Sequence, residues 1–322
     1  MLSVSGAYIA VVAEWLHAQG YGASPLCQRI KQFKPEQTIP VAVAETLLAE
    51  SCTISGERLA PLKIGRLVKR RHLGSIGHML AASRTLEQLL NTYVYYEGLF
   101  YGQSIANLRR GDEGLELYWP QKDAPENYSR LAISSIASTI EEMGLPRSSI
   151  STASFPFRDE KNLRIYLGEL GCGEVLFGRE LGVQFPASAL HLSLNIEESI
   201  SARQHVVHTL LPELGDIEFA ERLYDEVVFA LPRRQARLSW IANRLSMSER
   251  TLQRRLSPCH DGLRGVINRI RMHLARLYLE DEGMNLLAMS LLLGYSEQSA
   301  LQLAFKRFYG ITPGQWRRKR RG

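Results

Sequence analysis

Arginine and glutamine side chains recur along one face of a short segment in the C-terminal third of the chain. Arg250, Gln253 and Arg254 share one side of a helix at this spacing, opposite Leu252 and Leu256. Arginine can donate two parallel hydrogen bonds to guanine in the major groove. The spacing therefore predicts a helix that reads base edges of double-stranded DNA, with phosphate binding as the alternative role of the arginines.

A second segment, later in the chain, repeats this arrangement with fewer charged groups. Its exposed face presents Ser299, Gln302 and Leu303, of which glutamine can pair with adenine and leucine can touch a thymine methyl group. The opposite face is expected to be buried and consists of Ala300, Leu301, Ala304, Phe305 and Phe308. We expect base contacts from both segments, with more hydrogen bonds from the first.

Phosphate contacts are expected from residues beside these two faces. The candidates are Arg255 in the first segment and Lys306 and Arg307 in the second. Ser248 and Ser296 are predicted to lie at helix N-termini, where a hydroxyl caps backbone N–H groups and the helix dipole favours phosphate. Capping alone also explains both serines.

Each segment follows an apolar helix and a tight turn, which makes two helix-turn-helix patterns, at about residues 239–257 and 286–308. A helix from about Glu218 to Leu231 precedes them, and Thr312-Pro313 is predicted to open a last short helix. A long helix between the patterns is predicted from the apolar stripe of Leu263, Val266, Ile267, Ile270, Leu274 and Leu277. Residues 217–322 are therefore expected to form an all-α domain.

The charge distribution separates this region from the rest of the chain. From Arg233 to Gly322 there are 18 basic and 6 acidic residues, whereas residues 1–232 hold 21 basic and 27 acidic residues. A basic C-terminal third beside an acidic remainder indicates a polyanionic partner for one domain only.

Residues 1–200 are predicted to form an α+β domain, followed by a linker over residues 201–216. The segments Leu115–Tyr118 and Leu163–Leu167 alternate like half-buried strands, and Thr85 is expected to cap a helix. The aromatic run Tyr93, Tyr95, Tyr96, Phe100 and Tyr101 can line a ligand pocket, although core packing is the preferred interpretation.

Signatures of catalysis or metal binding are not recognised. The sequence holds no Gly-rich phosphate loop and no nucleophile elbow, and its four cysteines lack metal-ligand spacing. His205 and His208 lie one turn apart, yet a surface or structural role is preferred for both. We expect no signal peptide and no membrane span. The chain is interpreted as a cytoplasmic protein that is not an enzyme and has no cofactor.

Three stretches resemble the AraC/XylS family of bacterial transcription regulators, namely Met247–Leu256, Leu291–Ala300 and Phe305–Pro313. The resemblance covers about residues 217–318 and implies two helix-turn-helix subdomains that read adjacent major-groove segments. It places the base-reading positions on Arg250, Arg254, Ser299 and Leu303. Leu303 departs from the arginine common at its position, and Ser246 stands where the first turn often has glycine.

The N-terminal region is similar to the arabinose-binding-type sensor domain of one AraC subfamily. The similarity lies in Leu73–Leu86, Phe155-Pro156-Phe157, Leu170-Gly171-Cys172, Phe177-Gly178 and Val183-Gln184-Phe185. It implies sensing of a small-molecule effector, dimerisation, or both, and it identifies no effector.

The whole sequence is thus interpreted as a two-domain, sequence-specific DNA-binding regulator. The resemblance implies an effector-responsive activator that works as a homodimer with RNA polymerase as a partner. Two alternatives stay open, a DNA-modifying or repair enzyme that borrows the same DNA-binding module and an architectural DNA binder without effector control.

Overall fold

The structure is a computed structural model of the 322-residue chain. It describes residues 3–35, 37–73, 75–80, 83, 85–101, 106–120, 124–192, 194, 207–209, 211–280, 284 and 286–321. The chain divides into two compact units, Met1–Asn195 and Ile196–Gly322. The first combines helices with sheets, and the described residues of the second form helices and connecting turns but no strand, which confirms the predicted fold class.

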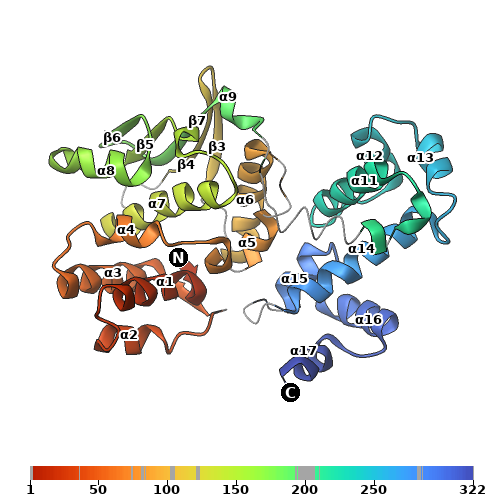
Figure 1. Ribbon diagram of the computed structural model, residues 1–322, viewed down its shortest axis with the longest axis horizontal. Coiled ribbons are helices and arrows are strands. Elements are labelled where there is room, and N and C mark those ends of the chain that lie inside the picture. The colour runs from red at the N-terminus through yellow and green to blue at the C-terminus, as the bar shows by residue number, and fades with distance from the viewer. Residues whose placement is uncertain are drawn as a thin grey trace. The chain divides into compact units, whose positions relative to one another are not determined.

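A five-stranded sheet forms one layer of the first unit (Figure 1). Its strands, in spatial order, are β3 (Asn107–Gly111), β4 (Gly114–Trp119), β7 (Leu181–Pro186), β5 (Thr152–Phe155) and β6 (Glu174–Phe177). Neighbouring strands are antiparallel except for β5 and β6, which run parallel. The predicted strand at Leu115–Tyr118 is confirmed as β4, where Leu115, Leu117 and Trp119 alternate toward the core.

The helix α7 (Glu126–Glu142) lies between this sheet and the N-terminal helices (Figure 1). Small side chains let α4 (Ala60–Gly65) approach it closely, since a Cβ on Gly65 would come within 2.6 Å of the Ser134 Cβ. The Ser134 hydroxyl donates to the Leu62 carbonyl at 2.6 Å and therefore satisfies a polar group that this packing buries.

The N-terminal layer holds α1 (Gly6–Ala18), α2 (Pro25–Ile30) and α3 (Val41–Ser55), with a two-stranded sheet of β1 (Ser3–Ser5) and β2 (Thr38–Pro40). Apolar residues at helical spacing bury the inner face of this layer, among them Ile9, Val12, Leu16, Leu47 and Leu48. The remaining helices of the unit are α5 (Ser75–Leu80), α6 (Leu86–Tyr101), α8 (Leu163–Leu170) and α9 (Ala187–Leu190).

Two local predictions for this unit have opposite outcomes. Thr85 does cap α6, because its hydroxyl oxygen accepts the backbone N–H of Gln88 at 3.3 Å. The strand expected at Leu163–Leu167 is wrong, since these residues begin α8. The buried positions of α8 are Tyr166 and Leu170, at helical i,i+4 spacing, whereas Leu163 and Ile165 are exposed.

A buried ionic network joins α7 to the segment after β5. The Arg130 side chain is 3% exposed and donates to Tyr166 Oη at 2.7 Å and to Asp159 Oδ2 at 3.2 Å. The Tyr166 hydroxyl also donates to Asp159 at 3.1 Å. The Phe157 ring lies under the guanidinium, with its centroid 4.6 Å away, so the Phe155-Pro156-Phe157 stretch helps to enclose the charges.

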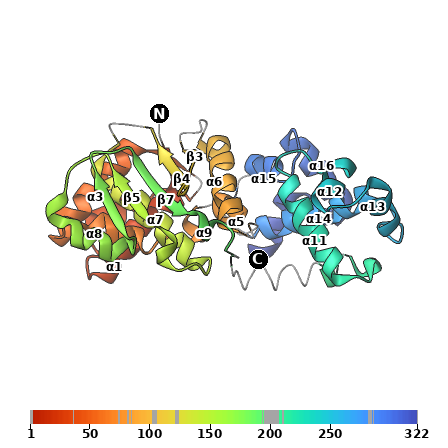
Figure 2. The same ribbon diagram turned by 90° about the horizontal axis from the view of Figure 1, so that it is seen from above.

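In the second unit, α14 (Gly262–Tyr278) runs between two groups of helices (Figure 2). The first group is α11 (Ile217–Ala230), α12 (Leu238–Arg244) and α13 (Glu249–Arg255). The second is α15 (Leu286–Leu292), α16 (Gln298–Tyr309) and α17 (Pro313–Arg321). The predicted long helix is therefore confirmed, and its stripe buries Val266, Ile267, Ile270 and Leu274.

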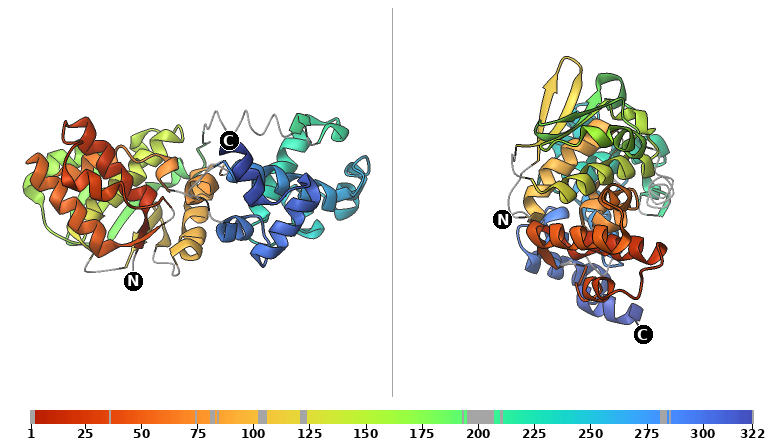
Figure 3. Two further views of the ribbon diagram at one scale, coloured as in Figure 1. Left: turned by 90° about the horizontal axis from the view of Figure 1, so that it is seen from below. Right: turned by 90° about the vertical axis from the view of Figure 1, so that its left-hand side faces the viewer.

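The last helix begins as predicted but extends further. Thr312 Oγ1 accepts the backbone N–H of Gln315 at 3.3 Å, and Gln315 Oε1 accepts that of Thr312 at 2.9 Å, which is a reciprocal capping box. The Trp316 ring packs against Phe305 and Tyr309 at centroid distances of 5.7 and 5.0 Å. The basic residues after Trp316 continue this helix as far as Arg321, which can be followed at the C-terminal end of the chain in Figure 3.

Candidate nucleic-acid interface

The two helix-turn-helix motifs make their turns with the same backbone hydrogen bonds. In the first, Ser246 N–H donates to Asn243 O at 3.0 Å and Met247 N–H to Ala242 O at 3.0 Å. In the second, Gly294 and Tyr295 make the corresponding bonds to Leu291 and Ser290 at 3.0 and 2.9 Å. In both turns, one N–H donates to the carbonyl three residues earlier and the next N–H to the carbonyl five residues earlier. The two motifs are therefore alike in structure as well as in sequence.

The first motif presents α13 as its second helix. Ser248 is the N-cap, and its hydroxyl oxygen accepts the Thr251 N–H at 3.1 Å, which confirms the predicted cap. Leu252 and Leu256 are 0% and 1% exposed and fix the helix against its own unit. On the opposite face, Arg250, Gln253 and Arg254 are exposed, as predicted.

The side chains of Arg250, Gln253 and Arg254 make no hydrogen bond or ion pair within the described part of the chain. Other arginines of this unit are engaged internally. Arg244 pairs with Glu226 at 2.9 Å, and Arg269 pairs with Glu213 at 2.7 Å. The outer face of α13 therefore carries two cations that are available to an external partner.

Arg255, the next arginine along α13, is placed differently. Its guanidinium lies 3.4 Å from Asp216 Oδ2 and 4.7 Å from the centroid of the Phe219 ring, both on the α11 side. A phosphate contact by Arg255 stays a prediction, and it would require the side chain to leave Asp216.

The second motif differs from the first by one residue in its turn. Ser296 is this additional residue, so α16 begins at Gln298 with Glu297 as its N-cap and no side-chain capping bond. The predicted capping role of Ser296 is therefore wrong. The Ser299 hydroxyl donates to Glu297 Oε2 at 2.9 Å, which engages one of the candidate base-contacting groups.

The buried face of α16 agrees with the expected stripe at Leu301 and Phe305 and departs from it at the C-terminal end of the helix. Leu301 and Phe305 are fully buried, whereas Phe308 is 42% exposed, contrary to prediction. Tyr309 takes the inner position instead, with its ring 4.7 Å from Phe305 and its hydroxyl donating to Met272 O at 3.1 Å. Residues at i,i+4 spacing from Leu301 thus form the inner face.

The outer face of α16 carries fewer polar groups than that of α13. Leu303 is 53% exposed, Gln302 is half-buried, and Lys306 and Arg307 are exposed. An exposed leucine at a base-reading position has no donor or acceptor, so it can contribute only apolar contact.

A surface groove of about 1010 Å³ lies beside α16, along one face of α14. Arg264, Asn268 and Arg271 line it from α14, and Arg307 and Phe308 line it from α16. Sequence reasoning assigned α14 from its apolar stripe and did not single out Arg264 and Asn268. The i,i+4,i+7 spacing of Arg264, Asn268 and Arg271 was the available signal.

Arg271 also connects α14 to the second motif. Its Nε donates to the Leu293 carbonyl at 2.8 Å, and its guanidinium lies 4.9 Å from the centroid of the Tyr295 ring. Burial lowers the pKa of Arg271 from its ordinary value. Arg271 therefore holds the turn of the second motif against α14.

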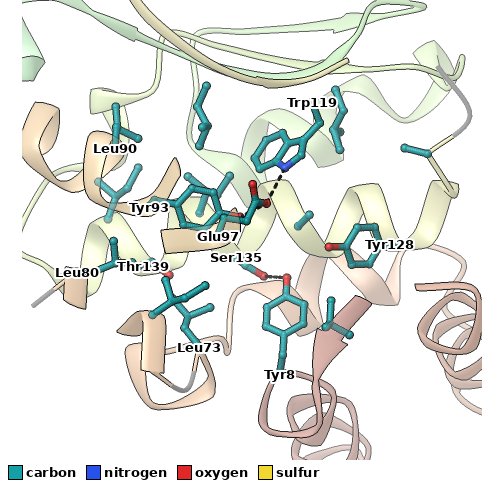
Figure 4. Close-up of a pocket in the computed structure, with 18 of the residues that line it drawn as sticks. Tyr8, Leu73, Leu80, Leu90, Tyr93, Glu97, Trp119, Tyr128, Ser135 and Thr139 are labelled. Carbon is teal, nitrogen blue, oxygen red and sulfur yellow. Dashed lines mark hydrogen bonds between the residues drawn. The ribbon is translucent and has the colours of Figure 1, made fainter. Parts of the chain in front are cut away.

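The first unit contains an apolar cavity, and Tyr93 from the predicted aromatic run lines it (Figure 4). Tyr95 is 43% exposed, so the two tyrosines do not share one environment. The side chains of Tyr96, Phe100 and Tyr101 lie outside the described residues. Of this run, Tyr93 lines a cavity, and the binding of a ligand there stays a prediction.

Residues that could support other chemistry are not assembled in the described parts of the chain. No group of three or more His, Cys, Asp or Glu side chains there is arranged to hold a metal ion. His205 lies outside the described residues. Cys172 is buried, and burial raises the pKa of its thiol, which disfavours the reactive thiolate. None of the described helices is long and apolar enough to cross a bilayer.

Two protein-family models match the chain. A helix-turn-helix domain matches residues 241–319, and the N-terminal arabinose-binding domain of AraC transcription regulators matches residues 28–194. The second match alone spans more than half of the chain, and each match falls within one of the two units.

The chain is also similar to individual proteins. The HTH-type transcriptional regulator VirS of Mycobacterium tuberculosis is 30% identical over 270 residues, which covers 78% of this chain and 77% of VirS. An uncharacterized HTH-type transcriptional regulator of Mycobacterium bovis is 35% identical over 79 residues, or 24% of this chain and 23% of its own. The crystal structure of the transcriptional regulator CdpR from Pseudomonas aeruginosa matches at 18% identity and a TM-score of 0.41, covering 95% of this chain and 98% of that one.

Proposed function

The chain belongs to the AraC family of transcription regulators, and we propose that it inserts α13 and α16 into adjacent major-groove segments of promoter DNA. Recognition helices in such motifs enter segments about one helical turn, or about 34 Å, apart. The observation that supports this most directly is the outer face of α13, where Arg250 and Arg254 are exposed and unengaged among the described residues.

Sequence readout is assigned mainly to α13. Arg250 and Arg254 can each donate two hydrogen bonds to guanine, and Gln253 between them can pair with adenine. In α16, Ser299 and Gln302 supply fewer hydrogen bonds and Leu303 supplies apolar contact only. The two halves of the binding site are therefore proposed to differ in how strictly their bases are read.

Phosphate contacts are assigned to the flanks of these helices. Ser248 lies at the N-terminus of α13, while Lys306 and Arg307 are exposed on α16. Arg264 and Asn268 extend this set along the α14 groove, where Arg307 is also a lining residue. Arg255 and Ser296 remain weaker candidates because Asp216 engages Arg255 and the turn, rather than the helix N-terminus, holds Ser296.

The first unit is proposed to be the regulatory half of the protein. We assign residues 1–200 to effector sensing and dimerisation, residues 201–216 to a linker and residues 217–322 to DNA binding. Activation of transcription with RNA polymerase in the cytoplasm, by a homodimer, is the mode of action that we propose. We assign no enzymatic activity to the chain.

Nuclease footprinting on promoter fragments tests this function with the full-length protein. We expect protection of two segments one helical turn apart and an affinity that falls steeply with salt, because bound phosphates release counterions. Salt-dependent coating without a preferred site would support the architectural alternative. Modification of the DNA would support the enzyme alternative, and a folded protein that binds no DNA would overturn the proposal.

A further inference from the structure

The groove of about 1010 Å³ along α14 extends between the two helix-turn-helix motifs. From the first motif it is lined by Ala236, which precedes α12, and by His260, which follows α13. From the second motif it is lined by Arg307 and Phe308 of α16. The α14 groove therefore occupies the surface that joins the two motifs.

The α14 groove adjoins the outer face of α16. Ser299, Leu303 and Arg307 follow one another at i,i+4 spacing and therefore lie along one side of this helix. Leu303 and Arg307 are exposed, and Arg307 also lines the groove. A ligand that covers the outer face of α16 therefore reaches the edge of the groove.

Two arginines and one amide of the groove are available to an external partner. Arg264 and Asn268 are exposed and lie one turn apart on α14, and Arg307 faces the same groove from α16. The side chains of these three residues make no hydrogen bond or ion pair within the described part of the chain. They can therefore donate hydrogen bonds to an acceptor-rich ligand.

The other charged groups of the lining are engaged within the protein. Arg269 pairs with Glu213 at 2.7 Å, and Arg271 holds the turn of the second motif. Asp261 is the one carboxylate among the described lining residues, and its Oδ1 lies 3.3 Å from His260 Nδ1. The groove thus presents a positive surface, which favours a polyanion.

The proposed docking on DNA places a minor groove beside this surface. Two major-groove segments that lie one helical turn apart on one face of a duplex are separated on that face by the minor groove. The helix α14 joins the motifs that would occupy these segments, and its groove adjoins the outer face of α16. The minor groove, with a phosphate backbone on each side, is therefore the part of the DNA nearest to the α14 groove.

Minor grooves differ in width and in electrostatic potential according to their sequence. A·T tracts have a narrow minor groove with enhanced negative potential, which attracts an arginine inserted into it. Their minor-groove edges carry acceptors, whereas a G·C pair adds an amino donor that an arginine cannot bond. A free guanidinium such as that of Arg264 is therefore better accommodated by A·T pairs.

We propose that the α14 groove binds the minor groove between the two major-groove segments, with the Arg264 guanidinium between the two phosphate backbones. The protein would thereby prefer A·T pairs at positions that neither recognition helix touches. This inference rests on the proposed DNA-binding function and adds α14 as a third element, which reads the DNA through its shape.

Duplexes that carry one footprinted site test this preference with the unaltered full-length protein. The bases between the two protected segments are replaced by an A·T tract, by a G·C run or by a run of inosine·C pairs of the same length. We expect the A·T tract to bind about tenfold more tightly than the G·C run, as one hydrogen bond to a charged group implies. Competition binding at fixed salt measures the three affinities.

The inosine duplex separates the two grooves of the DNA. Inosine lacks the amino group that guanine places in the minor groove, and it keeps the major-groove acceptors of guanine. We therefore expect the inosine·C run to bind like the A·T tract. If it binds like the G·C run, the preference comes from major-groove contacts and the inference is overturned. Equal affinities for all three duplexes would overturn it as well.

Arg264→Ala tests the residue that we place in the minor groove. We expect the affinities for the A·T tract and the G·C run to become equal within about twofold, because the inserted cation is lost. Base preference within the two major-groove segments should stay unchanged. Arg276→Ala is the matched control, since Arg276 lies on the same helix and does not line the groove, so this variant should keep the A·T preference. An A·T preference that persists in Arg264→Ala would contradict the assignment.

The same experiments distinguish this inference from the proposed function. If the two segments are protected but the bases between them have no effect, the inference fails and the major-groove function stands. If the protein prefers none of these duplexes to random DNA, the proposed function itself fails. If Arg264→Ala binds every duplex as tightly as the unaltered protein does, the groove does not contact DNA, which overturns the inference in favour of an acidic protein segment as its partner.

Discussion

Ser246 and Gly294 adopt the same left-handed backbone at the same point of the two helix-turn-helix turns, with φ of 57° and 75°. The left-handed conformation costs a non-glycine residue about 1–2 kcal/mol, so the first motif holds strain that the second avoids. Gly294 is also sterically required, since a Cβ there would lie 2.3 Å from the Leu231 carbonyl oxygen.

Replacement of Ser246 by glycine is expected to stabilise the second unit by up to about 1 kcal/mol, as relief of strain exceeds the added chain entropy. Gly294→Ala is expected to destabilise it by at least about 1–2 kcal/mol, because strain and a backbone clash add. Calorimetric melting of the full-length protein measures both. If Gly294→Ala stabilises the protein, or Ser246→Gly strongly destabilises it, the left-handed backbone does not strain a non-glycine residue in these turns.

Arg254→Ala is expected to relax base preference at one position by about 1–3 kcal/mol of discrimination, the range for a bidentate arginine–guanine contact. Binding selection on randomised DNA measures this. Arg255→Ala is the matched control, an adjacent arginine that contacts Asp216 and Phe219. Its removal should leave base preference unchanged. Equal loss of specificity in both variants would show that Arg254 is not a base reader.

Substitutions at Lys306 and Leu303, both exposed on α16, are expected to change DNA binding in different ways. Lys306→Ala should weaken binding to all sequences similarly and lower the salt slope by about one unit, as loss of one phosphate contact does. Leu303→Ala should have a small effect, confined to a thymine position. If Leu303→Ala reduces base specificity more than Arg254→Ala does, α16 rather than α13 is the main reader of the DNA sequence.

The first unit is expected to lose stability as the pH falls below about 6.5. Burial lowers the pKa of His72, with Glu14 at 3.1 Å acting in the opposite direction. The unfolded chain therefore takes up the proton first, which favours unfolding at lower pH. Melting temperatures at pH 7.5 and 5.5 should differ more for the unaltered protein than for His72→Gln. The exposed His17→Gln variant should behave like the unaltered protein.

Asp159→Ala is expected to destabilise the first unit by about 3–5 kcal/mol, because it leaves Arg130 buried without its buried partner. Glu126 is the other carboxylate that pairs with Arg130, and its side chain is 53% exposed. Glu126→Ala should therefore cost less than about 1 kcal/mol of stability. Urea unfolding compares the two. Similar losses of stability in the two variants would mean that the Arg130–Asp159 pair stabilises the unit no more than an exposed ion pair does.

The sequence was sufficient to predict those features that depend only on residues of a single helix. The caps at Ser248 and Thr312 and the apolar stripe of α14 depend on residues within a few turns of one another, and all three are present. The short stretch at Leu163–Leu167 is ambiguous because strand and helix patterns share its apolar positions. Burial of Tyr166 under α7 decides for the helix.

The cavity could not be predicted in the same way. Glu97, Trp119 and Ser135 meet only because α6, β4 and α7 pack together, and no spacing along the chain indicates this. In the interface, an additional residue in one turn displaced the N-cap from Ser296 to Glu297. At the C-terminal end of α16, Tyr309 rather than Phe308 packs inward, beside the predicted Leu301 and Phe305. A difference of one residue changes which side chains face inward, and apolar content alone does not resolve it.

The α14 helix, seventeen residues in length and joined to the second turn through Arg271, sets the rotation and the separation of the two helix-turn-helix motifs. Each residue inserted in a helix turns everything beyond it by about 100° and advances it by about 1.5 Å. An insertion of one residue would therefore rotate α16 relative to α13, and we expect it to prevent both helices from entering adjacent segments of one DNA site. The length of α14 is therefore expected to set the spacing of the two DNA segments that one copy of the protein can bind.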